Sequence, residues 1–496
     1  MKPDAAWLDD ARLPLTSRTA TRAFVLGYLL NAAFDAVLPA VLRKISPRDA
    51  LRRIFSSASS FRAGSALFFY AALYRTILQL LSQLKLARSA PRDSGTKAQT
   101  HRARLQARLY RFLRSPLLAP FVAASLSTPA LLLLPANPFP RQMLAIDFAS
   151  KAAAAAYQES RRSGSRITSW VPAWCDSALL YCVSNAQLLY AYLLYPEAFP
   201  AGSAADDRPL QRSSAYLPPR PHDLPASIEW PSGRQVLDGV GELTIARPTA
   251  APYPSFVSPV LSSLQGKPPP ASPYASLNTV LDYAPAHPAH SRLLCAVLHP
   301  REPSCTRNFL GFFKKEWLTS AKFVAAWMAA LQLLSWRKVV KDPETALFKF
   351  GMAVVQGATV ISGGIGTAWA LICVFQHWLP RTLLPRGRFF LNGFIAGLTI
   401  YLVPAARRHQ LGMYVGRMSA KSTWQILEKE KRVRPVPHGE ALLLAAALAT
   451  MAAMYEARPE ALTGYLRLAT SKLVGPRQGA PTVAAAAVTA EKEKAA

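Results

Sequence analysis

Long stretches with almost no charged side chain recur along this chain. A helix of about 20 apolar residues crosses a hydrocarbon core of roughly 30 Å, so stretches of this length are able to span a membrane. The pattern therefore predicts an all-α, polytopic transmembrane protein. The stretches cover residues 23–43, 63–84, 115–135, 170–195, 316–336, 352–379, 389–405 and 440–456.

The composition agrees with a membrane protein and excludes other classes. Hydrophobic residues make up 51% of the 496 residues and charged residues only 17%, compared with about 25% in typical soluble proteins. The 58 Lys and Arg outnumber the 28 Asp and Glu and give a net charge of +30. A disordered chain would have fewer apolar residues, and five Cys are too few for a disulfide scaffold. Apolar spans joined by Arg-rich loops account for both the hydropathy and the charge.

Prolines divide the chain into two halves. Residues 201–290 hold 16 of the 41 prolines and no apolar run of spanning length, so we expect a linker that is mostly without regular structure. This division predicts an N-terminal tail (1–22), an N-terminal membrane half (23–200), the Pro-rich linker (201–290), a C-terminal membrane half (291–475) and a disordered C-terminal tail (476–496).

The two halves resemble each other, which indicates an internal repeat. The pattern Pro47-x-x-Ala50-Leu51 returns as Pro343-x-x-Ala346-Leu347, and each copy precedes a Gly-containing apolar stretch. We therefore predict two related helical bundles joined by the linker, an arrangement common in transporters and channels. Further matches, all separated by the same distance along the chain, pair Arg141, Leu144 and Tyr157-Gln158 with Arg408, Leu411 and Trp424-Gln425.

A basic segment, residues 85–114, holds nine Lys or Arg side chains and one acidic residue. Arg104, Arg108 and Arg111 recur at helical spacing beside a stripe of apolar residues, which is typical of an amphipathic helix on an anionic lipid surface. The alternative is a solvated loop whose charge follows the positive-inside rule. No nucleic-acid-binding module accompanies the charge, so we expect a lipid partner and no nucleic acid.

Two cysteines and a histidine lie close together directly after the linker. Cys295, His299 and Cys305 offer thiolate and imidazole ligands that bind zinc, and His287 or His290 would supply a fourth ligand. The spacing is not that of a standard zinc knuckle. Two alternatives stay open, which are a Cys295–Cys305 disulfide or redox pair and a structural turn that holds the linker against the bundle.

Ionisable residues inside the apolar stretches are candidates for a functional path, because a charge within a bilayer is costly. If these side chains face a polar cavity, the chain is a transporter or channel with a polar path between its two halves. The alternative is that each side chain extends its charged end to the membrane surface. The candidates are Asp35, Arg75, Asp176, Lys322 and His377.

Glycines recur four residues apart in the C-terminal half, as Gly393-x-x-x-Gly397 and Gly412-x-x-x-Gly416. Small residues at this spacing let two helix backbones approach closely. We therefore expect tight helix packing at these four positions.

Motifs for catalysis and cofactor binding are missing from the sequence. We find no Ser-His-Asp arrangement, P-loop, dinucleotide fingerprint or HExxH motif, so we expect neither an enzyme nor an organic cofactor. Asp4, Asp9 and Asp10 make the N-terminus unlike an acid-poor mitochondrial presequence, and it lacks the basic and apolar regions of a secretory signal. These features predict an internally addressed membrane protein.

Four distinctive motifs lie in the C-terminal half. They are Cys295-x-x-x-His299-Pro300 with Pro303-Ser304-Cys305 and Asn308-Phe309-Leu310, the Gly-rich stretch 357–366, Arg407-Arg408-x-x-x-Gly412-Met413-Tyr414, and His438-Gly439-Glu440-Ala441-Leu442-Leu443. These motifs resemble the transmembrane protein 135 family. The resemblance covers residues 291–475 and extends more loosely to the first half, as expected for a divergent, fungal-type member. The cysteine-rich region of the family carries more Cys than this chain.

The resemblance implies a role at an organelle membrane. Members of the family are polytopic proteins of peroxisomes and mitochondria, linked to organelle dynamics and to lipid and cholesterol handling. We thus expect an integral peroxisomal or mitochondrial protein of lipid metabolism or organelle dynamics, with the bilayer and other organelle-membrane proteins as partners. The resemblance supplies no catalytic residue. The alternatives are the transporter or channel above and a peripheral helical protein that binds membranes through the basic segment.

Overall fold

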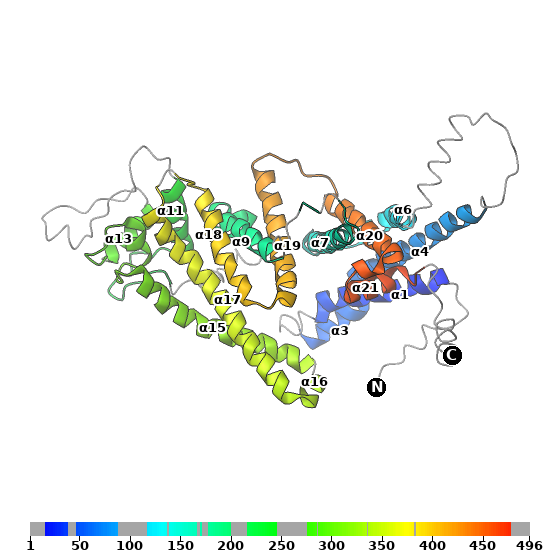
Figure 1. The fold of residues 1–496 in the computed structure, drawn as a ribbon, viewed down its shortest axis with the longest axis horizontal. Coiled ribbons are helices and arrows are strands. Elements are labelled where there is room, and N and C mark those ends of the chain that lie inside the picture. Colours follow the sequence, from blue (N-terminus) through cyan, green and yellow to red (C-terminus); the bar gives the residue numbers. More distant parts are fainter. Residues whose placement is uncertain are drawn as a thin grey trace. The chain divides into compact units, whose positions relative to one another are not determined.

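The computed structural model describes residues 15–37, 46–87, 117–135, 138–165, 169–170, 177–199, 216–245, 275–284, 286–334, 336–380 and 383–477. The chain is helical within these ranges and forms no β-strand there (Figure 1), which confirms the predicted all-α class. It divides into two compact units. Unit 1 comprises Met1–Val171 and Pro435–Ala496, and unit 2 comprises Pro172–Arg434.

Four helices in the described ranges are long and apolar enough to cross a membrane. They are Arg48–Leu81, Ser177–Leu194, Pro343–Trp378 and Gly439–Ala457, and we call them the four apolar helices. Two other predicted spans form the shorter apolar helices Leu118–Leu133 and Gly387–Leu402, in which a tight 3₁₀ turn replaces the last part of the α-helix. Residues 316–334 of the predicted span 316–336 lie in the helix Cys305–Leu334, which also carries charged side chains, among them Lys314 and Lys322.

Unit 1 is built around two groups of packed helices. Helix α1 packs along α4, and α20 packs on both α6 and α7. Helix α4 also contacts α6, and α21 contacts α1, α4 and α20. The helices are α1 (Leu15–Ala32), the π-helix η2 (Ala33–Val37), α3 (Pro47–Ser56), α4 (Ala58–Ala87), α6 (Leu118–Ser127), η3 (Thr128–Leu133), α7 (Pro138–Arg162), α20 (Gly439–Ala457), η7 (Pro459–Ala461) and α21 (Gly464–Val474).

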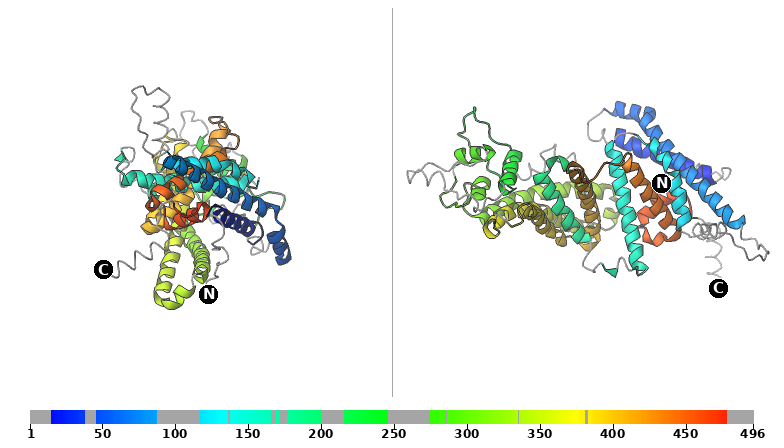
Figure 2. Two further views of the ribbon diagram at one scale, coloured as in Figure 1. Left: turned by 90° about the vertical axis from the view of Figure 1, so that its right-hand side faces the viewer. Right: turned by 90° about the horizontal axis from the view of Figure 1, so that it is seen from above.

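Unit 2 contains a long helical hairpin and a layer of short helices. Helices α15 and α17 run side by side, as the left panel of Figure 2 shows in yellow-green. Helix α18 packs on α17, and α9 packs on both α18 and α19. The helices are α9 (Ser177–Leu194), η4 (Pro196–Ala198), α11 (Gly233–Ile245), α13 (Ala275–Tyr283), α14 (Leu293–Leu298), α15 (Cys305–Leu334), α16 (Trp336–Lys341), α17 (Pro343–Trp378), α18 (Gly387–Gly397), η6 (Leu398–Leu402) and α19 (Ala405–Lys429).

The repeated proline motif marks the same local structure in both halves. Pro47 and Pro343 each occupy the first turn of a helix, where a missing backbone N–H costs nothing. The residue before each proline caps the helix. The Ser46 hydroxyl accepts from the Asp49 N–H at 3.1 Å, and the Asp342 carboxylate accepts from the Thr345 N–H at 3.3 Å.

Other elements also recur with matching lengths and order. Helices α7 and α19 both have 25 residues, and each follows a short apolar helix that ends in a 3₁₀ turn. Helices α9 and α20 are each followed by a 3₁₀ turn of sequence Pro-Glu-Ala. The order α-helix, 3₁₀ turn, 25-residue helix, apolar helix, Pro-Glu-Ala turn therefore occurs twice in the described chain.

The two units do not coincide with the two predicted halves. Helix α9 belongs to the N-terminal half of the sequence but packs on α18 and α19 in unit 2. Helix α20 belongs to the C-terminal half but packs on α6 and α7 in unit 1. The last apolar helix of each half is thus a component of the unit built mainly from the other half.

Part of the segment expected to be an irregular linker is ordered. Residues 216–245 and 275–284 include α11 and α13, and Tyr216, Val236, Leu237, Val240 and Leu277 are buried in one apolar cluster with α14. The apolar residues of α11 recur at helical spacing and form one buried face. The prediction of irregular structure rested on the high proline content of residues 201–290, and it overlooked this short apolar pattern.

Candidate functional site

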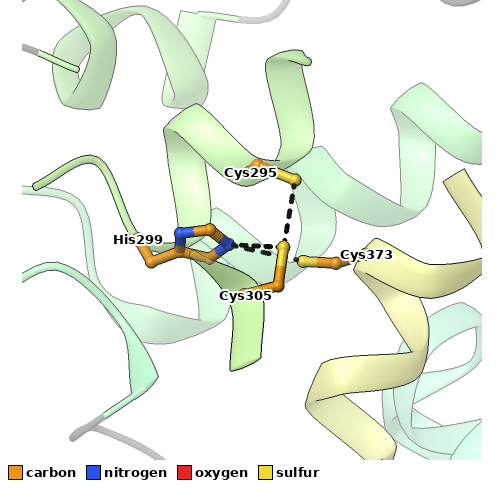
Figure 3. A group of neighbouring side chains, drawn as sticks. All are labelled: Cys295, His299, Cys305 and Cys373. Carbon is orange, nitrogen blue, oxygen red and sulfur yellow. Dashed lines mark hydrogen bonds between the residues drawn. The ribbon is translucent and has the colours of Figure 1, made fainter. Parts of the chain in front are cut away.

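A cluster of four sulfur and nitrogen ligands lies within unit 2. The side chains of Cys295, His299, Cys305 and Cys373 point toward a common centre (Figure 3). Cys295 lies in α14, His299 follows the end of α14, Cys305 is the first residue of α15, and Cys373 lies in the last turns of α17. The four ligand atoms all lie within 4.8 Å of one another. We call these four residues the thiol–imidazole cluster.

Three pairs of ligand atoms in the cluster lie close together. The Sγ atoms of Cys295 and Cys305 lie 3.8 Å apart. His299 Nε2 lies 3.4 Å from the Sγ of Cys305 and 3.7 Å from the Sγ of Cys373. Cys295, His299 and Cys373 are buried, and Cys305 is half-buried. None of the cysteines that the structure describes is part of a disulfide.

The local sequence accounts for this convergence. All six residues of α14 are buried, so the short helix is fixed in the apolar cluster of unit 2. The chain then turns through Pro300 to the start of α15, and the Nδ1 of His299 lies 2.7 Å from the Glu302 carbonyl oxygen. Because a carbonyl oxygen only accepts hydrogen bonds, Nδ1 carries a proton and donates to it, and Nε2 faces the sulfurs.

The histidines expected as the fourth ligand lie outside the cluster. His287 is exposed, and its Nδ1 accepts from the Ala289 N–H at 3.1 Å. His290 is buried, but its Nε2 lies 3.1 Å from the His299 carbonyl oxygen. Cys373 occupies the fourth position, although sequence reasoning did not include it. All of α15 and most of α17 separate it from Cys305 in the sequence, and only the packing of α14 and α15 against α17 brings it close.

Hydrogen bonds within the cluster favour a charged state. Burial alone would lower the pKa of His299, but hydrogen bonds to Cys295 and Cys305 outweigh it and raise the pKa to about 10. Hydrogen bonds from Cys295, Cys373 and His299 lower the pKa of the Cys305 thiol well below its usual range. The thiolate is the form of cysteine that binds metal ions and attacks disulfides.

The ionisable residues predicted inside membrane spans do not converge on one site. Arg75 is buried in α4 and donates to the carbonyl oxygens of Val474 and Pro476. Asp35 is half-buried and accepts from the Asn31 amide at 2.7 Å. Lys322 and His377 are exposed in unit 2, and Asp176 lies outside the described residues. Asp35 and Arg75 therefore bind different partners.

The predicted glycine positions differ in how closely another helix approaches. A methyl group on Gly393 would lie 2.7 Å from the Ala186 Cα, and one on Gly397 would lie 2.9 Å from the Cys182 Cα. A methyl group on Gly412 would lie 2.5 Å from the Ser177 carbonyl oxygen. At Gly416 the nearest atoms lie 3.7 Å away, which is ordinary van der Waals contact. Helix α9 therefore packs tightly on α18 and on the start of α19.

The basic segment 85–114 lies outside the described residues, apart from the backbone of the last turn of α4. Its expected contact with anionic lipid is a prediction from the sequence alone.

Together, these features define a class of protein. The part of the chain that the structure describes is helical, contains four helices long and apolar enough to cross a membrane, and holds a largely buried cluster of three thiols and an imidazole. Comparison with protein families, curated proteins and solved structures finds no match to this chain. The resemblance to the transmembrane protein 135 family rests on the sequence motifs quoted above.

Proposed function

We propose that this chain is an integral, multi-pass membrane protein of peroxisomes or mitochondria that acts in lipid metabolism or in the dynamics of these organelles. The four apolar helices support the membrane assignment, and the family resemblance supports the organelle and the role. The bilayer is the main partner, with anionic lipid at the basic segment 85–114 and other organelle-membrane proteins as further partners. No enzymatic activity is part of the proposal.

The observation that carries this proposal is the exposure of the four apolar helices. Only 33 to 50% of the most apolar window of each helix is buried, and large side chains such as Phe69, Leu73, Val183 and Val355 are exposed on them. Apolar surface in water costs about 25 cal/mol per Å², and a helix that is apolar on all sides requires an apolar environment. A bilayer supplies that environment to every exposed side.

We also propose that unit 1 and unit 2 are related helical bundles that descend from one repeated element. The repeated order of helices and the two capped proline motifs support this relationship. In this interpretation each bundle has exchanged its last apolar helix, since α20 packs on α6 and α7 as α9 packs on α18 and α19. Residues 201–290, with α11 and α13, connect the two halves of the sequence.

The transporter or channel alternative has less support. Arg75 is held by backbone carbonyl groups within unit 1, and the exposed Lys322 and His377 lie on different helices of unit 2.

A matched pair of substitutions tests the membrane assignment. Leu73 lies in the middle of α4 and is 42% exposed, while Leu468 lies on α21, outside the four apolar helices, and is 59% exposed. Arginine in the centre of a membrane span costs roughly 2.5–3.5 kcal/mol, whereas an exposed surface substitution in water changes stability by about 0.5 kcal/mol or less. We expect Leu73→Arg to reduce the fraction of chain that resists alkaline carbonate extraction, and Leu468→Arg to leave it unchanged.

Release of the unmodified chain by carbonate would reject the membrane assignment. The organelle is tested separately by placing an epitope tag within residues 246–274 and imaging it against peroxisomal and mitochondrial markers. Coincidence with either marker supports the proposed role. A plasma-membrane or secretory-pathway signal would contradict it and would favour the transporter alternative.

A further inference from the structure

We propose that Cys295, His299, Cys305 and Cys373 bind one zinc ion in a closed tetrahedral site, and that this ion fastens α14 and the start of α15 to the end of α17. The proposal is independent of the organelle and of the role proposed above. It rests on the donor set, the geometry and the surroundings of the thiol–imidazole cluster.

The donor set is that of a structural zinc site. Three thiolates and one imidazole form one of the common four-ligand sets for structural zinc. Magnesium and calcium prefer oxygen ligands, and soft thiolates favour zinc, copper(I) or iron–sulfur clusters. Catalytic zinc sites keep one position open for water or substrate, but four protein ligands fill a tetrahedral shell. The arrangement therefore indicates a structural role.

The distances fit a tetrahedral ion. Zinc–sulfur bonds of about 2.3 Å and zinc–nitrogen bonds of about 2.0 Å place two sulfur ligands about 3.8 Å apart, and a sulfur and a nitrogen about 3.5 Å apart. The Sγ atoms of Cys295 and Cys305 are 3.8 Å apart, and His299 Nε2 lies 3.4 Å and 3.7 Å from two sulfurs. These three separations match those that zinc requires, and all four ligand atoms lie within 4.8 Å of one another.

The surroundings orient and isolate the ligands. The Glu302 carbonyl oxygen, 2.7 Å from His299 Nδ1, fixes the imidazole with Nε2 toward the sulfurs, as in many zinc sites. Phe312, Trp369 and Ile372 belong to the buried apolar cluster that also includes Cys295 and Cys373. Thiolates buried in such surroundings are costly unless their charge is compensated, and a divalent cation supplies that compensation.

Zinc at this position joins segments that are distant in the sequence. Cys295 lies near the start of the C-terminal half and Cys373 near the end of α17, and their elements belong to two parts of unit 2, the short-helix layer and the long hairpin. The donation from Arg292 to the Gln376 carbonyl at 2.8 Å connects the same two segments. The ion would therefore hold the layer of α11, α13 and α14 against the end of one apolar helix.

The test measures the metal content of the full chain, purified in detergent through a tag without histidines and in the absence of chelators. We expect elemental analysis to find about one zinc per chain in the wild-type protein. Cys373→Ser removes one of the four ligands and should purify without zinc. Cys182→Ser is the matched control, since Cys182 is a buried cysteine of α9 outside the cluster, and it should retain the zinc.

A second variant separates ligand loss from misfolding. Cys373→His keeps four zinc ligands and should retain zinc, whereas Cys373→Ser should not. Cobalt(II) bound to the wild-type protein should give the thiolate charge-transfer and tetrahedral absorption bands of a Cys₃His site, with weaker charge-transfer intensity in Cys373→His. Zinc-free wild-type protein, a Cys295–Cys305 disulfide in the purified protein, or zinc content unaffected by Cys373→Ser would each overturn the proposal.

Discussion

Arg75 is a buried charged residue that stabilises the fold of unit 1. Its side chain is 2% exposed within α4, and its guanidinium donates to the carbonyl oxygens of Val474 and Pro476. Gly475 lies between them with a positive φ of 86°, and a methyl group there would lie 2.5 Å from the Arg75 Nη2. The arginine therefore holds the end of α21, and the glycine leaves room for it.

Replacing Arg75 should release the end of α21. Arg75→Leu leaves two carbonyl groups without their donor, which costs about 1–3 kcal/mol for each buried group left unpaired. We expect a lower melting temperature in detergent and faster cleavage of the C-terminal residues by protease. Arg62→Leu on the exposed side of the same helix is the control and should have little effect. Unchanged stability with a loss of solute flux would instead assign Arg75 to a transport path.

Two glycines of α19 should respond differently to alanine. Gly412→Ala places a methyl group 2.5 Å from the Ser177 carbonyl oxygen, so α9 and α19 must separate, and we expect a loss of about 1–3 kcal/mol. Gly416→Ala meets only ordinary contacts at 3.7 Å and should be neutral or stabilising by up to about 1 kcal/mol. Thermal unfolding in detergent measures both. Equal effects of the two substitutions would contradict the close approach at Gly412.

Sequence reasoning identified three members of the thiol–imidazole cluster because they lie close together along the chain. It missed Cys373 because a single cysteine in an apolar stretch is not a signal by itself, and tertiary packing alone brings it to Cys305. It also grouped Gly416 with Gly412, although a four-residue spacing specifies the helix face and not the distance to the neighbouring helix.

At the scale of whole elements, the exchange of the last apolar helices has a measurable consequence. Unit 1 lacks α20 when only the N-terminal half is present, and unit 2 lacks α9 when only the C-terminal half is present. The exposed faces of α6, α7, α18 and α19 would then have no partner.

We therefore expect fragments 1–250 and 251–496 to aggregate or be degraded when each is expressed alone, and to co-purify as one species when expressed together. Size-exclusion chromatography in detergent distinguishes these outcomes. Two fragments that are each stable and monodisperse on their own would show that the halves fold independently and that the exchange has no energetic importance.

Helices were predictable where an apolar pattern extends over many residues, as in α4, α17 and α20. The starts of α3 and α17 were also marked in the sequence, by prolines that follow a capping Ser or Asp. The unit to which α9 and α20 belong was not predictable, because both helices are apolar on most sides and fit either bundle by composition. For α9, the close approach to Gly393 and Gly397 of α18 is a specific packing contact that composition does not reveal.

For the molecule as a whole, removing zinc should affect one unit and not the other. The thiol–imidazole cluster lies within unit 2. We expect a strong chelator to increase protease cleavage between residues 216 and 304, in the layer of short helices that the ion holds. It should also lower the temperature of the first melting transition. Sites in α7 and α20 of unit 1 should be cleaved at unchanged rates. Uniform loosening of both units would contradict a local structural ion.

The order of segments in unit 1 also affects how the protein is made. Its two parts are separated in the sequence by the whole of unit 2, Pro172–Arg434. At about 5–20 residues per second, a ribosome needs on the order of 13 to 50 s to synthesise that insertion. During this interval α20 has not been synthesised, so the apolar side chains of α6 and α7 that pack on it stay exposed. The bundle begun first is therefore completed last, and a chaperone or insertase that shields α6 and α7 would have its greatest effect in that interval.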